Sequence, residues 1–210
     1  MPVFRYRRQL HLNPTASVFV CQLHEDIRAL IEDAAQHVYN DFWHNQTGNV
    51  CKQIPNHDEG DDEGDKGLLK LAATCQYIFQ DKLKIGNVMD VSAMRWRNPA
   101  DVGLHIDDKL LGATMCIMTL RCKYEGKQLD KDYAGGYDLH LAGPDKEKFK
   151  VRINRNEIYF LAGESRYTWK HSVKASVMAL KDTLRLFLPN IDIPSALANT
   201  NVPSDMRVEG

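Results

Sequence analysis

The chain has 210 residues and a formal net charge of −1, with 43% hydrophobic and 26% charged residues. This length predicts one domain, residues 1–210, with a sizeable core. The near-zero charge argues against nucleic-acid binding driven by overall positive charge, so a basic binding surface would have to be local. No apolar run has membrane-spanning length, and the first residues lack the apolar segment of a signal peptide. We therefore expect an intracellular protein, cytoplasmic or nuclear, with no membrane partner.

The cysteines point to the same kind of compartment. Their number is odd, no C-x-x-C pair occurs, and most lie in apolar runs, which is typical of buried free thiols. A reducing environment is therefore expected. The five residues are Cys21, Cys51, Cys75, Cys116 and Cys122.

The N-terminal part, up to about residue 87, is expected to be helical. Apolar residues recur at intervals of three and four from about Leu23 to Trp43, which predicts one amphipathic helix. A second helix is expected from about Leu68 to Leu83. Between the two, the acidic and glycine-containing run from Asp58 to Asp65 predicts a solvated loop.

From about residue 88 to residue 192 the chain consists of short β-rich runs separated by turn signals such as Gly143-Pro144. About eight strands after two helices predict an α+β fold. Its core would be a double-stranded β-helix (jelly roll), with the N-terminal helices packed on one sheet and a tail at residues 193–210. The expected strands are Val88–Trp96, Leu104–Ile106, Thr114–Cys122, Tyr137–Leu141, Phe149–Ile153, Glu157–Leu161, Lys170–Val173 and Thr183–Leu188.

Three residues in this part have the side chains of a metal site. A strand places residues i and i+2 on one face, so His105 and Asp107 can bind the same ion. His171 would complete a set of two histidines and one carboxylate. Such a set leaves coordination positions open, as a non-haem Fe(II) oxygenase requires.

The segments around these residues resemble a known family. The run from Gly163 to His171, Gly-Glu-Ser-Arg-Tyr-Thr-Trp-Lys-His, is similar to the distal-histidine segment of the AlkB-like Fe(II)/2-oxoglutarate dioxygenases. His105-x-Asp107 fits the same family, and the two histidines are 66 positions apart, which is a usual separation there. The resemblance covers about Val88 to Pro189 and implies a jelly-roll dioxygenase domain.

The resemblance also implies roles in catalysis and co-substrate binding. His105, Asp107 and His171 would be the catalytic iron ligands, with 2-oxoglutarate and O2 as co-substrates. Arg185 would bind the distal carboxylate of 2-oxoglutarate, since a guanidinium can hold a carboxylate through two hydrogen bonds. Trp96 would pack against this co-substrate or donate a hydrogen bond to it.

The leading substrate class implied by the family is a nucleic acid or nucleobase. A methyl or alkyl group would be oxidised, by demethylation or stable hydroxylation, with release of succinate and CO2. Asp108, Trp169 and Arg95 are the candidate substrate contacts. Asp108 could accept a hydrogen bond from an exocyclic amine of an extruded base. A turn residue at the strand end is the alternative for Asp108.

Two departures from the family pattern keep other substrates open. The family's Asn-x-Tyr pair is replaced by Met94-Arg95-Trp96, and its second arginine by Ile191. Arg95, Arg97 or Lys170 would have to replace that arginine. The alternatives are a hydroxylase of a protein side chain or small molecule, and a binding module without turnover. A third is a methylpyrimidine hydroxylase similar to the TET and base J enzymes, suggested by the run Gly112–Arg121.

Other polar residues could also form a metal or phosphate site. His37 and His44 lie seven residues apart on the first predicted helix, which is not the four-residue spacing of helical metal ligands. His140 and Asp138 share one face of a predicted strand. Surface or core roles are expected for all of them. The basic start, Arg5, Arg7 and Arg8, fits either a phosphate contact or a solvated strand edge.

Overall fold

The computed structural model describes residues 2–41, 50–54, 66–96, 103–120, 123–124, 127–128, 136–154, 156–175, 181–198, 201 and 205. The predicted acidic loop from Asp58 to Asp65 lies outside these residues, as do His44, Arg97 and Cys122. Within the described part, no helix is long and apolar enough to cross a membrane.

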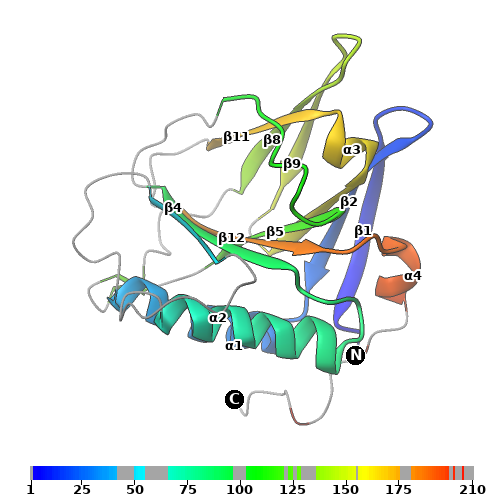
Figure 1. Ribbon diagram of the computed structural model, residues 1–210. Coiled ribbons are helices and arrows are strands. Elements are labelled where there is room, and N and C mark those ends of the chain that lie inside the picture. Colours follow the sequence, from blue (N-terminus) through cyan, green and yellow to red (C-terminus); the bar gives the residue numbers. More distant parts are fainter. Residues whose placement is uncertain are drawn as a thin grey trace.

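The described strands form two principal antiparallel sheets (Figure 1). The large sheet has the order β1-β2-β10-β5-β12-β4-β3, and the small sheet has the order β11-β8-β9. The strands of the large sheet are β1 (Phe4–His11), β2 (Ala16–Leu23), β3 (Val50–Ile54), β4 (Asp90–Trp96), β5 (Thr114–Leu120), β10 (Glu157–Gly163) and β12 (Lys181–Leu188). Those of the small sheet are β8 (Tyr137–Ala142), β9 (Lys148–Ile153) and β11 (Lys170–Ala175).

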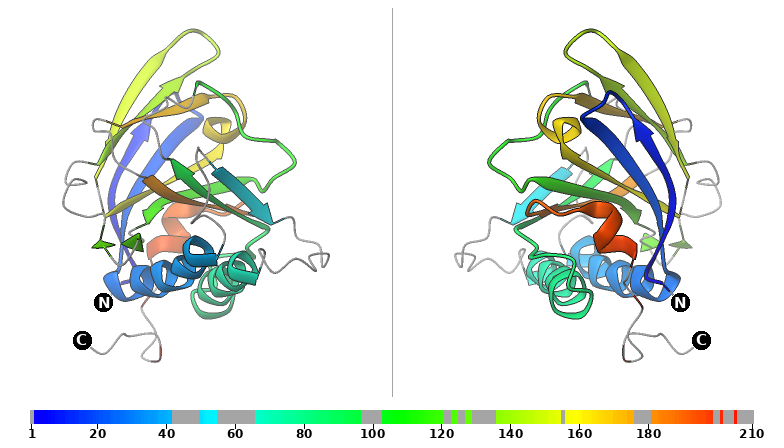
Figure 2. Two further views of the ribbon diagram at one scale, coloured as in Figure 1. Left: turned by 90° about the vertical axis from the view of Figure 1, so that its left-hand side faces the viewer. Right: turned by 90° about the vertical axis from the view of Figure 1, so that its right-hand side faces the viewer.

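The remaining described elements are one short hairpin and the helices. The hairpin pairs β6 (Lys123–Tyr124) with β7 (Lys127–Gln128). The two longer helices lie side by side below the large sheet in the views of Figures 1 and 2. The helical elements are α1 (Glu25–Asp41), α2 (Lys66–Gln76) with its π-helical continuation η2 (Tyr77–Lys82), α3 (Glu164–Tyr167) and α4 (Ile193–Ala198).

Buried hydrophobic residues form two clusters, and β12 contributes to both. Leu184 and Leu186 belong to the first, which also contains Ile27 of α1 and Leu71 of α2; we call it the helix cluster. Phe187 belongs to the second, the sheet cluster, which joins residues of the large sheet to those of the small sheet. Successive side chains of a strand point to opposite faces, so one strand can serve both clusters.

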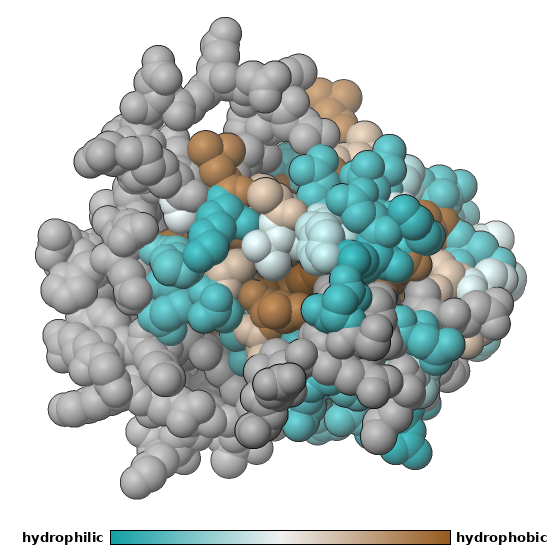
Figure 3. All heavy atoms as spheres, turned by 90° about the horizontal axis from the view of Figure 1, so that it is seen from below, coloured by the Kyte–Doolittle hydropathy of each residue, from teal (hydrophilic) through white to brown (hydrophobic). Residues whose placement is uncertain are grey.

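The outer side of the helices is mostly polar where it is described. Seen from below the view of Figure 1, hydrophilic side chains lie on both sides of a central hydrophobic area, and a few more hydrophobic side chains show near the upper edge (Figure 3). This distribution is what an amphipathic helix produces when its apolar stripe is buried.

The α+β class and most expected elements are confirmed. Helices occupy 25–41 and 66–76, and seven of the eight expected strands are present with ends shifted by a few residues. Cys21, Cys75 and Cys116 are free and buried, as expected. Burial raises the pKa of the Cys21 thiol to about 12, so this thiol stays protonated at neutral pH.

Two predictions of secondary structure were wrong. The N-terminal part is not wholly helical, because β1, β2 and β3 lie within it. β2 pairs with β10, more than a hundred residues later, and such a partner leaves no local signal. Leu104–Ile106 is not a strand: only His105 pairs, through an isolated bridge to His171.

Candidate metal centre

The main chain brings the two histidines together. His105 N donates to His171 O at 3.0 Å, and His171 N donates to His105 O at 2.8 Å. This double exchange is that of a hydrogen-bonded antiparallel pair, so the two side chains start from neighbouring positions. The loop that begins at Gly103 therefore lies along the free edge of β11, and it places Asp107 two residues beyond the bridge.

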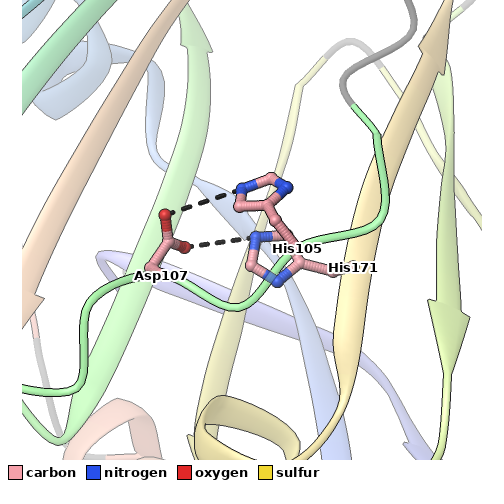
Figure 4. Close-up of side chains that lie close together, drawn as sticks. All are labelled: His105, Asp107 and His171. Atoms are coloured by element: carbon pink, nitrogen blue, oxygen red, sulfur yellow. Dashed lines mark ion pairs between the residues drawn. The ribbon is translucent and has the colours of Figure 1, made fainter.

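The three side chains converge on one point (Figure 4). Asp107 Oδ2 lies 3.2 Å from His171 Nε2, and Asp107 Oδ1 lies 3.7 Å from His105 Nε2. The imidazole rings are 4.5 Å apart between centroids. One potential ligand atom from each residue lies within 4.8 Å of the others, and this is the one such group found among the described residues.

This spacing fits a divalent metal. Bonds of about 2.1 Å to ligands at right angles put neighbouring ligand atoms about 3 Å apart. The 3.2 Å between Asp107 Oδ2 and His171 Nε2 is close to that value, while His105 Nε2 lies 3.7 Å from the other oxygen, Oδ1, and would have to move slightly toward a shared ion. His105, Asp107 and His171 could therefore hold a metal ion on one of its faces.

Hydrogen bonds set the protonation of the group. His105 Nδ1 lies 2.8 Å from Gly103 O, and a carbonyl only accepts, so Nδ1 carries the proton and Nε2 is free to bind a metal. The contact with Asp107 raises the pKa of His105, while burial lowers the pKa of His171. Burial would raise the pKa of Asp107, but the histidines and the charge of Arg185 outweigh it and hold that pKa far below its ordinary value.

Arg185 lies beside the metal group. Its side chain is 15% exposed, and its Nη1 donates to Asp107 Oδ1 at 2.5 Å. Arg185 is thus mostly buried and paired, and Leu184 and Leu186 lie on the opposite face of β12. The guanidinium therefore contacts the carboxylate of a candidate metal ligand.

Two polar residues flank Arg185 in the same row of the sheet. Arg185 is paired with Ile117 on one side and with Ser92 on the other, and Ile117 is paired in turn with Tyr159. Ser92 and Tyr159 are both buried. Sequence reasoning missed them, because the strand order that aligns them is set by pairing between distant segments.

Arg166 was also missed as a site residue, although it lies inside the quoted motif. It is almost fully buried on α3, and its guanidinium donates to the carbonyl oxygens of Asp107 and Asp108. Its place five residues before His171 is the signal that could have identified it. The loop that carries Asp107 is thus tied to the segment that carries His171.

The predicted substrate residues are found in different environments. Asp108 is exposed, and its Oδ1 accepts from Leu110 N at 2.9 Å, which is the turn role considered for it. Trp169 is fully buried in the sheet cluster, and its Nε1 has no hydrogen-bond partner within the described residues. Arg95 and Trp96 end β4, and their side chains lie outside the described part.

The competing histidines are not part of a metal group in the described residues. His37 Nε2 lies 2.7 Å from Lys70 Nζ, between the two long helices. His140 alternates along β8 with the buried Leu139 and Leu141, so it belongs to the outer face of the small sheet. A surface role is consistent with both positions.

The outer face of the small sheet is basic. Asp138 accepts there from Arg152 at 3.1 Å and lies 3.6 Å from Lys150. Farther along β8, Ala142 is paired with Lys170 of β11 on one side and with Lys148 of β9 on the other. No carboxylate lies between these two lysines in this row. Positive charge is therefore concentrated locally in a chain whose net charge is −1.

Comparison with known proteins adds no relative to this description. No protein-family model and no curated protein matches the chain. A function can therefore be argued only from the geometry of the two histidines, Asp107 and Arg185.

Proposed function

We propose that this protein is an Fe(II)/2-oxoglutarate-dependent dioxygenase, similar to the AlkB-like enzymes, that oxidises a methyl or alkyl group of a nucleic acid or nucleobase. The observation that carries the proposal is the convergence of His105, Asp107 and His171, with Arg185 in contact with the same carboxylate. Two histidines and one carboxylate leave open positions on the metal for a co-substrate and dioxygen.

The proposed fold is the jelly roll of that family, with α1 and α2 packed on the large sheet. Two antiparallel sheets that share one hydrophobic cluster support it, with the metal group at the edge of the small sheet. Side chains of α1 and α2 in the helix cluster support the position of the helices.

Each residue of the centre has a defined task in this proposal. His105, Asp107 and His171 would bind iron, which supplies the activation of dioxygen when 2-oxoglutarate is bound. Arg185 would hold the distal carboxylate of 2-oxoglutarate, and its largely shielded position, 15% exposed, strengthens such an ion pair because water competes less. Ser92 and Tyr159 lie in the same row and offer hydroxyl groups beside that carboxylate.

Arg185 would have to divide its donors between two carboxylates. In the structure its Nη1 donates to Asp107 Oδ1. A guanidinium has five N–H donors, so the other nitrogen atoms remain for 2-oxoglutarate. The contact would also fix which oxygen of Asp107 is turned toward a metal, since one oxygen faces Arg185 and the other faces His171.

The basic outer face of the small sheet supports a polyanionic substrate. Lys170 is adjacent to His171 in β11, and β11 is the edge strand along which the loop of Asp107 lies. Lys170 and His171 point to opposite faces of the small sheet, so a phosphate backbone bound by Lys148 and Lys170 would lie on the other side of this sheet from the metal. Lysine contacts to phosphates supply affinity without base specificity, while groups at the edge would select the base.

The test of the chemistry is succinate release by anaerobically iron-loaded protein supplied with 2-oxoglutarate and O2. A panel of methylated oligonucleotides and nucleosides is compared for the wild type and His171→Ala. Turnover that depends on His171 and rises with one oligonucleotide is expected. Iron binding without any turnover would overturn the enzyme proposal in favour of a binding module.

The test of the substrate surface is oligonucleotide binding at several salt concentrations. Lys148→Gln combined with Lys170→Gln should weaken binding and reduce the slope of log affinity against log salt by about two. Lys84→Gln, an exposed lysine outside the small sheet, is the matched control. An unchanged slope in the double variant would contradict this placement of the phosphates.

A second candidate substrate is a protein side chain or small molecule. Leu104 and Leu110, on either side of the ligands His105 and Asp107, are 48% and 91% exposed. Exposed apolar side chains next to a site favour contact with an apolar partner surface. Turnover that no nucleic acid stimulates, but that a peptide or metabolite does, would select this alternative.

A further inference from the structure

Arg166 is a buried cation with an unusual set of partners. Only 1% of its surface is exposed, and among the described residues no carboxylate side chain forms an ion pair with it. Its guanidinium donates instead to three main-chain carbonyls, those of Asp107 at 3.1 Å, Asp108 at 2.6 Å and Leu111 at 3.5 Å. All three belong to the loop that follows His105, residues 106–111, which we call the ligand loop.

Burying a charge costs free energy, and the nearby carboxylates of Asp107 and Asp108 offset only part of this cost, since the pKa of Arg166 is still lowered by burial. Such a residue is expected to do something that a neutral side chain cannot. A planar guanidinium can bridge several carbonyls at fixed angles, whereas an amide or ammonium group cannot span them all. Arg166 therefore fixes the main chain from Asp107 to Leu111 in one conformation.

The other end of Arg166 is also fixed. Ser165 Oγ donates to Ala162 O at 2.8 Å and accepts from Ala162 N at 3.1 Å, which anchors α3 to the end of β10. The Arg166 guanidinium lies 5.6 Å from the centre of the Phe187 ring, within the range of a cation–π contact. The cation is thus supported from β10 and β12 while it reaches the ligand loop.

We propose that Arg166 is a positioning residue that sets the place of Asp107 relative to His171 and thereby sets the affinity of the centre for a metal. α3 runs directly into β11, so Arg166 links the two chain segments that carry the ligands. The inference rests on the metal site of the proposed function. It does not require iron to be the metal or 2-oxoglutarate to be the co-substrate.

The experiment is titration of the metal-free protein with Co(II) under anaerobic conditions, followed by visible absorption and calorimetry. Arg166→Gln keeps one donor group, and Arg166→Lys keeps the charge but not the planar fork. We expect a loss of Co(II) affinity of about 10- to 100-fold in Arg166→Gln, the range for residues that orient metal ligands, with a smaller loss in Arg166→Lys. The absorption bands should also change, because the position of the carboxylate changes.

The matched control is Arg28→Gln. Arg28 is also a buried arginine, and it donates to a main-chain carbonyl, that of Thr119, and to Glu32. It lies on α1, away from the ligand loop. Arg28→Gln should lose thermal stability like Arg166→Gln but should bind Co(II) with wild-type affinity and spectrum. Equal affinity in folded Arg166→Gln and wild type would overturn the proposal.

A second measurement needs no variant. Hydrogen exchange of the metal-free wild type should show protected amides at Leu110 and Leu111, which donate to Asp108, because the loop is held before metal binds. Exchange as fast as in an unstructured chain would overturn the proposal even if Arg166 variants fail to fold. A wild-type protein that binds no Co(II), although its loop is protected, would refute the proposed metal site instead.

Discussion

The two faces of β12 show how differently the two clusters are built. The helix cluster receives Leu184 and Leu186 together with apolar residues of α1 and α2. On the opposite face Arg185 contacts Asp107, and Tyr159 and Ser92 lie in the same row. One side of the strand thus supplies apolar burial, and the other carries charge at a candidate site. Changes on the two faces should therefore affect different measurements.

The largest effect is expected at His171, one of the three proposed metal ligands. His171→Ala removes one of three ligands, so Co(II) or Fe(II) affinity should fall more than 100-fold, and any turnover should fall at least as much. The metal-free protein should also lose some thermal stability, because His171 is buried and its Nε2 lies 3.2 Å from Asp107 Oδ2. Calorimetric titration and a thermal melt measure the two quantities. Retention of wild-type metal affinity would exclude His171 from the centre.

The next largest effect, a loss of stability, is expected from a change on the opposite face of β12, in the helix cluster. Leu186→Ala leaves a cavity in the helix cluster and should lower the free energy of unfolding by about 2–5 kcal/mol. Denaturant unfolding measures this loss. The fraction that remains folded should bind Co(II) as the wild type does. A weakened metal site in a fully folded Leu186→Ala sample would show that the two faces of β12 are coupled.

Arg185→Lys should act on the co-substrate. Lysine keeps the charge but cannot form two parallel hydrogen bonds to a carboxylate, so the KM for 2-oxoglutarate should rise about 10- to 100-fold. A comparison of succinate release at several 2-oxoglutarate concentrations separates KM from kcat. An unchanged KM would mean that Arg185 serves Asp107 alone and that the distal carboxylate binds elsewhere.

The smallest predicted effect is the pH dependence of metal binding. The pKa of His105 is raised above its ordinary 6.5 by the contact with Asp107, so a proton competes with the metal from neutral pH downward. The proton favours the metal-free state, and affinity should therefore fall as the pH drops from about 7.5 to 5.5. Asp107 stays ionised over this range, because its pKa is held far below its ordinary value. Titrations in two buffers of different ionisation enthalpy should detect a proton released on binding. A flat affinity over this range would contradict the assignment.

Much of this arrangement could be read from the sequence, and the limits have physical causes. His105, Asp107 and His171 were selected from spacing and motif, and Arg185 from the family resemblance, because these signals are local in the sequence. β2 was missed although it forms a hairpin with β1, and the strand that ties this hairpin into the large sheet, β10, is distant in sequence. Arg166 was missed for a related reason. Its acceptors are main-chain carbonyls, which every residue has, so no residue type marks them.

The bridge between His105 and His171 has a consequence for solubility. β11 ends the small sheet, and an edge strand with free main-chain groups can pair with another molecule. The main-chain N–H and C=O of His171 are already bonded to His105, so the ligand loop covers part of this edge. A change that detaches the loop would expose a template for intermolecular strand pairing, and self-association would then accompany loss of the metal.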